Sequence, residues 1–185
     1  IVFEQISDTT VIEAKFKNYD GFKSTHKDSK TPGIANAKMG TKISTGVEVI
    51  SNGQKTCVHL SSIDFEIGFS ELAVYVDKTY PENSCKYNAV LEHENTHVRI
   101  HQKTLKQYAR ELANMVYQKS VNMPPQEIPN NDNSAAQNVI SQIEANIKSI
   151  GKDYRSRIEQ AANVQHKDLD SKESYEQTRA LCKNW

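Results

Sequence analysis

The sequence predicts an α+β fold: a small antiparallel or mixed sheet with an edge strand packs on a long helix, followed by a second long helix and a short C-terminal helix. Residues 42–80 hold runs of alternating apolar and polar side chains, the spacing typical of strands. Beyond residue 85, apolar side chains recur at helical spacing in two long stretches. We expect residues 1–122 to form the sheet and first helix, and residues 123–185 to add the partner helix and tail of the same compact domain.

The strands are expected in the first half of the chain. The pair Asn52 and Gly53 lies between two alternating runs and is the strongest short hairpin signal. The segment 19–41 is rich in Gly, Lys, Asp and Ser, which favour a loop. The runs predicted to be strands are residues 9–17, 42–50, 55–65 and 70–80.

The second half of the chain predicts three helices. The first follows Asn83 and Ser84, either of which can cap a helix N-terminus. Pro and Asn residues between 123 and 133 interrupt the helical pattern. The second helix carries an apolar stripe from Ile140 to Ala161, so we expect it to pack antiparallel on the first as a helical hairpin. The expected helices are residues 85–119, 134–166 and 172–182.

The first of these helices contains the pattern His93-Glu94-x-x-His97. Side chains four positions apart on a helix share one face, so both imidazoles can reach the same metal ion. Zinc (Zn2+) is the expected cofactor because it binds neutral His nitrogens at about 2.0–2.1 Å. Glu94 lies roughly 100° around the helix from His93, where its carboxylate can accept a proton from a zinc-bound water. The pattern predicts two ligands and a general base; a surface helix with two unused histidines is the alternative.

A catalytic zinc site usually takes three protein ligands. His101 continues the spacing, but eight residues rise about 12 Å along a helix, so we expect it to lie beside the site or at the surface rather than to bind the ion. A hairpin closing near residues 120–134 would bring residues 153–160 level with His97. The third ligand is therefore expected from the second helix or the tail. Glu159, Glu173 and Asp170 are left open with equal weight, with Asp153 and His166 as further candidates.

The chain has three cysteines, Cys57, Cys85 and Cys182. A bridge from Cys85 to Cys57 would tie the start of the zinc-motif helix to the sheet, whereas a bridge from Cys182 would hold the C-terminal tail, and the sequence leaves both open. Disulfides are typical of exported proteins, so we expect an extracytoplasmic (periplasmic or secreted) location. The sequence starts at Ile1 without a signal-like segment, and we expect either a processed or a trimmed chain.

The composition bears on the partners. The 23 Lys and Arg residues balance 23 Asp and Glu residues, so no electrostatic footprint for nucleic acid or anionic membrane is present. No apolar run reaches the roughly 18 residues that a transmembrane helix needs. A peptide or protein substrate is the expected partner, and the oligomeric state does not follow from the sequence.

An edge strand at residues 72–80 followed by a helix with His93-Glu94-x-x-His97 resembles the zincin metallopeptidases. In particular, the chain is similar to bacterial secreted zinc-dependent proteases of unknown function. The resemblance covers roughly residues 57–112. It implies that the two histidines bind zinc, that the glutamate activates water, and that the edge strand aligns the peptide substrate.

The combined prediction is a zinc-dependent metallopeptidase with Glu94 as general base. The similar proteases have a histidine in the tail where this chain carries Tyr175, and the resemblance implies an oxyanion-stabilising role for this tyrosine. A zincin-like interaction module that holds a structural or vestigial metal without hydrolysis is the alternative, because no third ligand follows from spacing alone.

Overall fold

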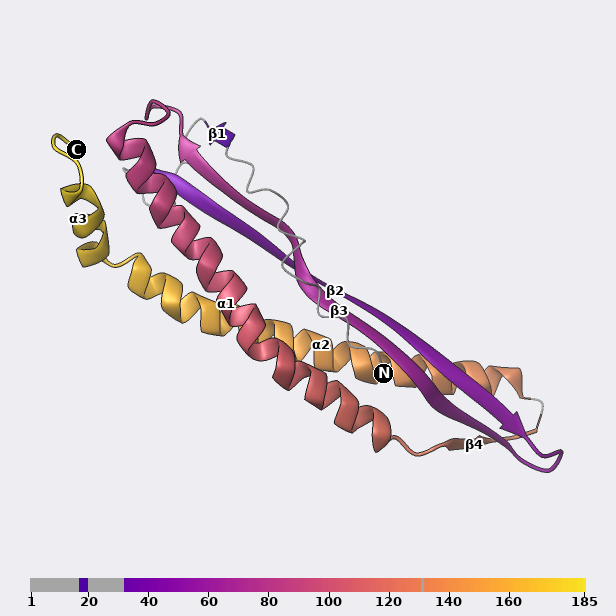
Figure 1. Cartoon of the computed structure of the whole chain (residues 1–185). Helices are drawn as coiled ribbons and strands as arrows, with labels where there is room; N and C mark the ends of the chain where they lie inside the picture. The colour runs from indigo at the N-terminus through magenta and orange to yellow at the C-terminus, as the bar shows by residue number, and fades with distance from the viewer. Residues whose placement is uncertain (1–16, 20–31, 131) are drawn as a thin grey trace. The chain divides into compact units, whose positions relative to one another are not determined.

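The computed structural model describes residues 17–19, 32–130 and 132–185. The α+β prediction is confirmed, with two long helices, a short C-terminal helix and a small sheet (Figure 1). The elements are β1 (Lys17–Tyr19), β2 (Gly33–Ser51), β3 (Thr56–Asp77), α1 (Cys85–Val121), β4 (Gln126–Ile128), α2 (Asn133–Leu169) and α3 (Lys172–Ala180).

A hairpin joins the two long strands, as the Asn-Gly pair predicts. The side chain of Asn52 accepts hydrogen bonds from the backbone N–H groups of Gln54 and Lys55, at 3.0 and 2.9 Å. Gly53 adopts φ +87°, a conformation that costs glycine little. The arrows of β2 and β3 consequently run in opposite directions (Figure 1).

The strands differ from the prediction in length and position. β2 begins at Gly33, so the loop predicted over 19–41 is wrong in its second part. The strands predicted at 55–65 and 70–80 are one strand of 22 residues. Gly and Asn are poor strand formers, but pairing between β2 and β3 overrides this weak local preference. The strand predicted over residues 9–16 lies outside the described residues.

The order of the strands shows that the predicted edge strand at residues 72–80 is not at an edge of the sheet. The sheet runs β1-β3-β2, with β4 also paired to β3. Residues Tyr75–Asp77 of β3 pair in parallel with β1, so the predicted edge strand at 72–80 is flanked on both sides. In this order β1 and β2 are the outer strands, and β2, with 19 residues, is the longer of the two.

The chain divides into two units. Among the described residues, the first comprises Gly40–Gly68 and Gln107–Arg157. The second comprises 17–19, 32–39, Phe69–Lys106 and Ile158–Trp185. Each unit therefore draws on both sides of residue 122, and each of the four long elements contributes a segment to both.

The core of the first unit confirms the apolar stripe predicted for the second helix. Ile147 and Tyr154 of α2 are buried with Leu112 and Val116 of α1 and with side chains of β3. Gly151 is also buried, and a Cβ atom there would lie 3.1 Å from ring carbons of Phe65. The glycine that weakens the helix locally thus allows the helix to approach the sheet closely.

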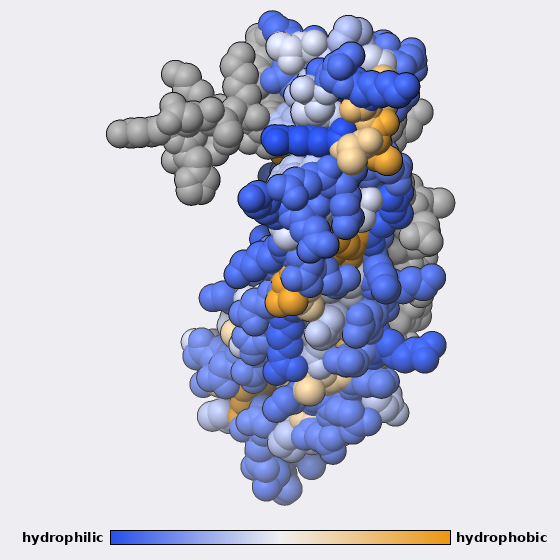
Figure 2. All heavy atoms as spheres, turned by 90° about the vertical axis from the view of Figure 1, so that its left-hand side faces the viewer, coloured by the Kyte–Doolittle hydropathy of each residue, from blue (hydrophilic) through white to orange (hydrophobic). Residues whose placement is uncertain are grey.

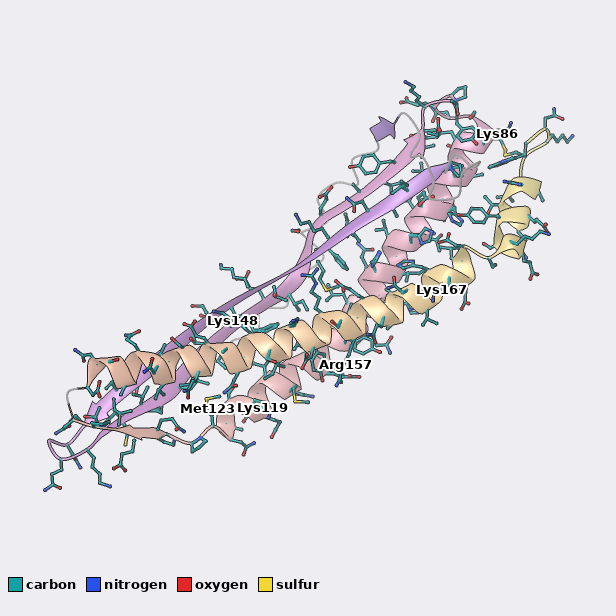
Figure 3. All side chains as sticks on the ribbon, turned by 180° about the vertical axis from the view of Figure 1, so that it is seen from behind. Lys86, Lys119, Met123, Lys148, Arg157 and Lys167 are labelled. Atoms are coloured by element: carbon teal, nitrogen blue, oxygen red, sulfur yellow. A yellow bond between two sulfur atoms is a disulfide. The ribbon has the colours of Figure 1, made fainter. Side chains whose placement is uncertain are left out.

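The second unit holds the candidate site and has its own small core, in which Val76, Tyr87 and Val90 are buried and Trp185 packs against them. A disulfide between Cys85 and Cys182 joins the first turn of α1 to the C-terminal tail, next to Lys86 in Figure 3. Of the two pairings that the sequence left open, the structure contains the one in which Cys182 holds the C-terminal tail.

The molecular face in Figure 2 is mostly hydrophilic, with scattered hydrophobic spots, in agreement with the polar composition. A search of the described helices for one long and apolar enough to cross a membrane found none.

Candidate metal centre

Helix α1 carries two of the three side chains that could donate a lone pair to a metal ion. The helix starts at Cys85, where the Ser84 hydroxyl accepts a hydrogen bond from the backbone N–H of Tyr87 at 3.2 Å and caps the N-terminus. Two turns later His93 and His97 point the same way, with their Nε2 atoms 3.3 Å apart. They are 7% and 9% exposed, so a rigid and buried helix segment holds both rings.

Asp170 supplies the third donor. Its Oδ1 atom lies 3.2 Å from His93 Nε2 and 3.1 Å from His97 Nε2. The residue follows the last turn of α2, where its backbone N–H donates to the His166 carbonyl at 2.8 Å, and it precedes Ser171, the N-cap of α3. Of the three carboxylates that the sequence left equal, the structure brings this one to the histidines.

The spacing of these donors suits a metal ion. Three ligands in tetrahedral directions at the Zn–N distance of 2.0–2.1 Å lie about 3.3–3.4 Å apart, and the observed separations are 3.1, 3.2 and 3.3 Å. Within the described residues this is the one group of three or more His, Cys, Asp or Glu side chains positioned to hold an ion. The side chain of Asp170 is 43% exposed, so solvent reaches this ligand, whereas His93 and His97 are buried.

Electrostatics favours an ionised Asp170. Partial burial opposes ionisation, but hydrogen bonds from His93 and His97 outweigh it and hold the pKa of Asp170 well below its usual value. A carboxylate that stays ionised across the physiological range is a suitable ligand for a hard or borderline cation.

Glu94 is buried beside the two histidines, with 5% of its surface exposed. Burial raises the pKa of its carboxyl group, and the neighbouring His97 and His93 together with a hydrogen bond from the Ala35 backbone oppose the rise. The start of β2 lies directly on this side chain. A Cβ atom at Gly33 would be 2.7 Å from Glu94 Oε1, so only glycine leaves room for the carboxylate.

Tyr175 of α3 contacts two of the three donor residues. Its ring stacks on His93 with a centroid separation of 5.1 Å and an angle of 28°. Its hydroxyl donates to Asp170 Oδ1 at 3.2 Å. Burial, followed by the negative charge of Asp170, raises its pKa above the ordinary value, so the phenol remains a neutral donor.

Two further histidines extend the site. His97 Nδ1 lies 2.8 Å from His166 Nδ1, and His166 Nε2 lies 3.1 Å from His101 Nε2. Burial lowers the pKa of His101 to about 4 and also lowers that of His166, so both rings are neutral near pH 7. His101 lies beside the site, as expected. The regular spacing of His93, His97 and His101 on α1 already indicated that His97 and His101 lie on one face of the helix. The sequence did not indicate that His166 lies between them, because it named His166 only as a further candidate for the third ligand.

The other predicted ligands lie elsewhere. Glu173 is exposed in the first turn of α3, and Glu159 is exposed on α2, where its charge acts on His101. Asp153 is exposed and belongs to the first unit. None of the three is part of the donor group found among the described residues.

The predicted helix register is also wrong. His97 meets His166, and Gln165 donates to Thr104 at 3.2 Å, instead of residues 153–160 lying level with His97. Between the two helices the chain forms β4, which pairs with Thr56–Val58 of β3, and the prediction did not include this strand (Figure 1).

Comparison with known proteins adds no relative: no family model matches the chain, and neither the curated proteins nor the solved structures gave a match.

Proposed function

We propose that this protein is a zinc-dependent metallopeptidase in which His93, His97 and Asp170 hold the ion and Glu94 is the general base. The observation that carries the proposal is the triangle of donor atoms, 3.1 to 3.3 Å on each side, next to the buried carboxylate of the same motif.

The donor set favours zinc in a catalytic role. Two imidazole nitrogens and one carboxylate oxygen are typical of catalytic zinc sites, which keep a fourth position open. When bound, zinc would acidify a water molecule and polarise the carbonyl group of a substrate. A structural site would instead be closed by a fourth protein ligand, and the donor group among the described residues has three members.

Glu94 is suited to proton transfer. A general base works best when its pKa lies near the operating pH, and burial shifts the pKa of this carboxyl group upwards in that direction. We infer that Glu94 accepts a proton during attack on the peptide carbonyl and returns it to the leaving amine.

An extended peptide is the substrate that best fits the surroundings of Glu94. The start of β2 lies on this side chain, and β2 is the long outer strand of the described sheet. A strand at a sheet edge can bind an extended peptide through backbone hydrogen bonds. The neutral hydroxyl of Tyr175 is a donor close to the same site, and we propose that it stabilises negative charge on the substrate carbonyl oxygen.

An extracytoplasmic location is part of this proposal. The Cys85–Cys182 disulfide supports it, since such bonds persist in oxidising compartments.

The test combines metal analysis with hydrolysis of an unfolded protein substrate. The native chain should contain about one zinc per molecule and cleave the substrate, whereas Glu94→Gln should keep the zinc and lose cleavage. Glu92→Gln is the matched control, because Glu92 is exposed and paired with Arg99 at 2.6 Å. Full cleavage by Glu94→Gln would refute the assigned role. Bound zinc without cleavage by the native chain would favour the alternative of a metal-holding interaction module.

A further inference from the structure

Three of the described histidines form a continuous chain of ring contacts, named here the histidine relay: His97, His166 and His101. One nitrogen of His97 lies 3.1 Å from Asp170 Oδ1, and the other lies 2.8 Å from His166 Nδ1. The remaining nitrogen of His166 lies 3.1 Å from His101 Nε2. Every ring nitrogen of His97 and His166 therefore has a defined partner.

We propose that metal binding reverses the direction of the hydrogen bonds along the histidine relay, and that His166 is the positioning residue that sets the metal-ready form of His97. This inference rests on the proposed metal site. A neutral imidazole has one N–H and one lone pair, and each of the two hydrogen bonds within the relay needs one of each. Fixing the proton on one ring therefore fixes the protons on the other two.

The metal-free arrangement follows from Asp170. An ionised carboxylate accepts only, so His97 carries its proton on Nε2 and donates to Asp170. The Nδ1 atom of His97 is then an acceptor, and His166 must donate to it from Nδ1. His166 Nε2 is left as an acceptor, so His101 donates to it from Nε2.

The metal-bound arrangement is the opposite. A ligand nitrogen needs its lone pair, so His97 Nε2 loses its proton to solvent and Nδ1 takes the proton of His166 Nδ1. His166 Nε2 in turn takes the proton of His101 Nε2, and His101 takes one from solvent at Nδ1. The three rings carry three protons before and after, so the relay changes tautomers and not charge.

The role of His166 follows from the direction of the hydrogen bonds in the metal-bound arrangement. A metal-binding histidine is oriented, and its ligand nitrogen made more basic, by the group that accepts its other N–H. For His97 that group is His166. The relay is thus a second layer of the site that the His-Glu-x-x-His pattern does not contain.

The tautomers can be read directly by long-range 1H–15N correlation spectra of 15N-labelled protein at pH 7, without metal and with one equivalent of Zn2+. We expect the N–H of His101 to move from Nε2 to Nδ1, and that of His166 from Nδ1 to Nε2. His59, paired with Glu48 at 3.3 Å in the first unit, is the internal control and should not change. Unchanged tautomers of His101 and His166 in a zinc-bound protein would overturn the relay.

Zinc titration calorimetry gives a second readout that does not depend on hydrolysis. His166→Ala should lower zinc affinity about 10- to 100-fold. His166→Gln, whose amide oxygen can accept from His97 and whose amide nitrogen can donate to His101, should recover most of the loss. His59→Ala should bind as the native chain does. Native affinity in a folded His166→Ala variant would contradict the positioning role, whereas a native chain that binds no zinc would overturn the proposed function itself.

Discussion

Asp170 and His97 are 73 residues apart in the chain, and their side chains meet at 3.1 Å. The contact joins the first half of α1 to the junction between α2 and α3. An ion held there would therefore be bound by two elements of the second unit at once, which couples metal binding to the folding of that unit.

Asp170→Asn should lower zinc affinity by at least about 10-fold. The amide is a weaker ligand than an ionised carboxylate, and it also loses the charge that complements the cation. Isothermal titration with Zn2+ measures the change. Asp168→Asn is the matched control, because Asp168 is exposed two residues away, and it should leave the affinity unchanged. Equal affinities for the two variants would exclude Asp170 as a ligand.

Loss of the disulfide should weaken both the fold and the site. Cys85→Ser removes a bridge that closes a loop of 97 residues and ties the end of the chain that follows Asp170 and Tyr175 to the start of α1. Removal of a native disulfide typically costs about 2–5 kcal/mol of unfolding free energy. Denaturant unfolding and zinc titration should both show the loss, while Cys57→Ser, which changes a free thiol, should leave both values near native. An unchanged zinc affinity in Cys85→Ser would show that the tail holds Asp170 in place without the bridge.

The helices and the hairpin could be predicted because their signals are local. The apolar stripe around Ile147 and Tyr154 needs only helical spacing, and the turn at Gly53 needs only its own backbone preference. The motif histidines share this advantage, since one helix sets their geometry.

The sequence named Asp170 only as one of three equal candidates for the third ligand, and it did not predict the start of β2, because both depend on distant parts of the chain. Asp170 and His97 are 73 residues apart, and no local pattern distinguishes Asp170 from Glu159 or Glu173. The composition around Gly33 predicted a loop, but Gly33 begins β2, and its lack of a side chain lets the backbone of β2 contact Glu94. Tertiary contacts override local preference at both places.

The buried Glu94 should make the metal-free protein less stable as pH rises. Its pKa is raised in the folded state by burial, so the folded chain holds this proton more tightly than the unfolded chain. The favourable contribution is present below the unfolded value of 4.5 and is lost as pH rises through the raised folded pKa. Glu94→Gln should therefore be more stable than the native chain at pH 7 in the presence of a chelator, with a smaller difference at pH 4. Chemical denaturation at the two pH values tests this, and a larger difference at pH 4 would contradict the sign.

Gly33→Ala should reduce hydrolysis more than zinc binding. The added Cβ atom would lie 2.6 Å from Val90 Cγ1 and 2.7 Å from Glu94 Oε1, so the glutamate side chain must move from its position beside the donor group. Small displacements of a catalytic group can cost about 10²-fold in rate, whereas His93, His97 and Asp170 are not among the atoms that the new methyl group approaches most closely. Gly40→Ala is the matched control in the same strand, because no atom lies within 4 Å of its added Cβ. We expect kcat to fall in Gly33→Ala with zinc content near native, and both values to stay near native in Gly40→Ala. Native kcat in Gly33→Ala would mean that the position of Glu94 against β2 is irrelevant to turnover, and the general base would then have to be sought elsewhere.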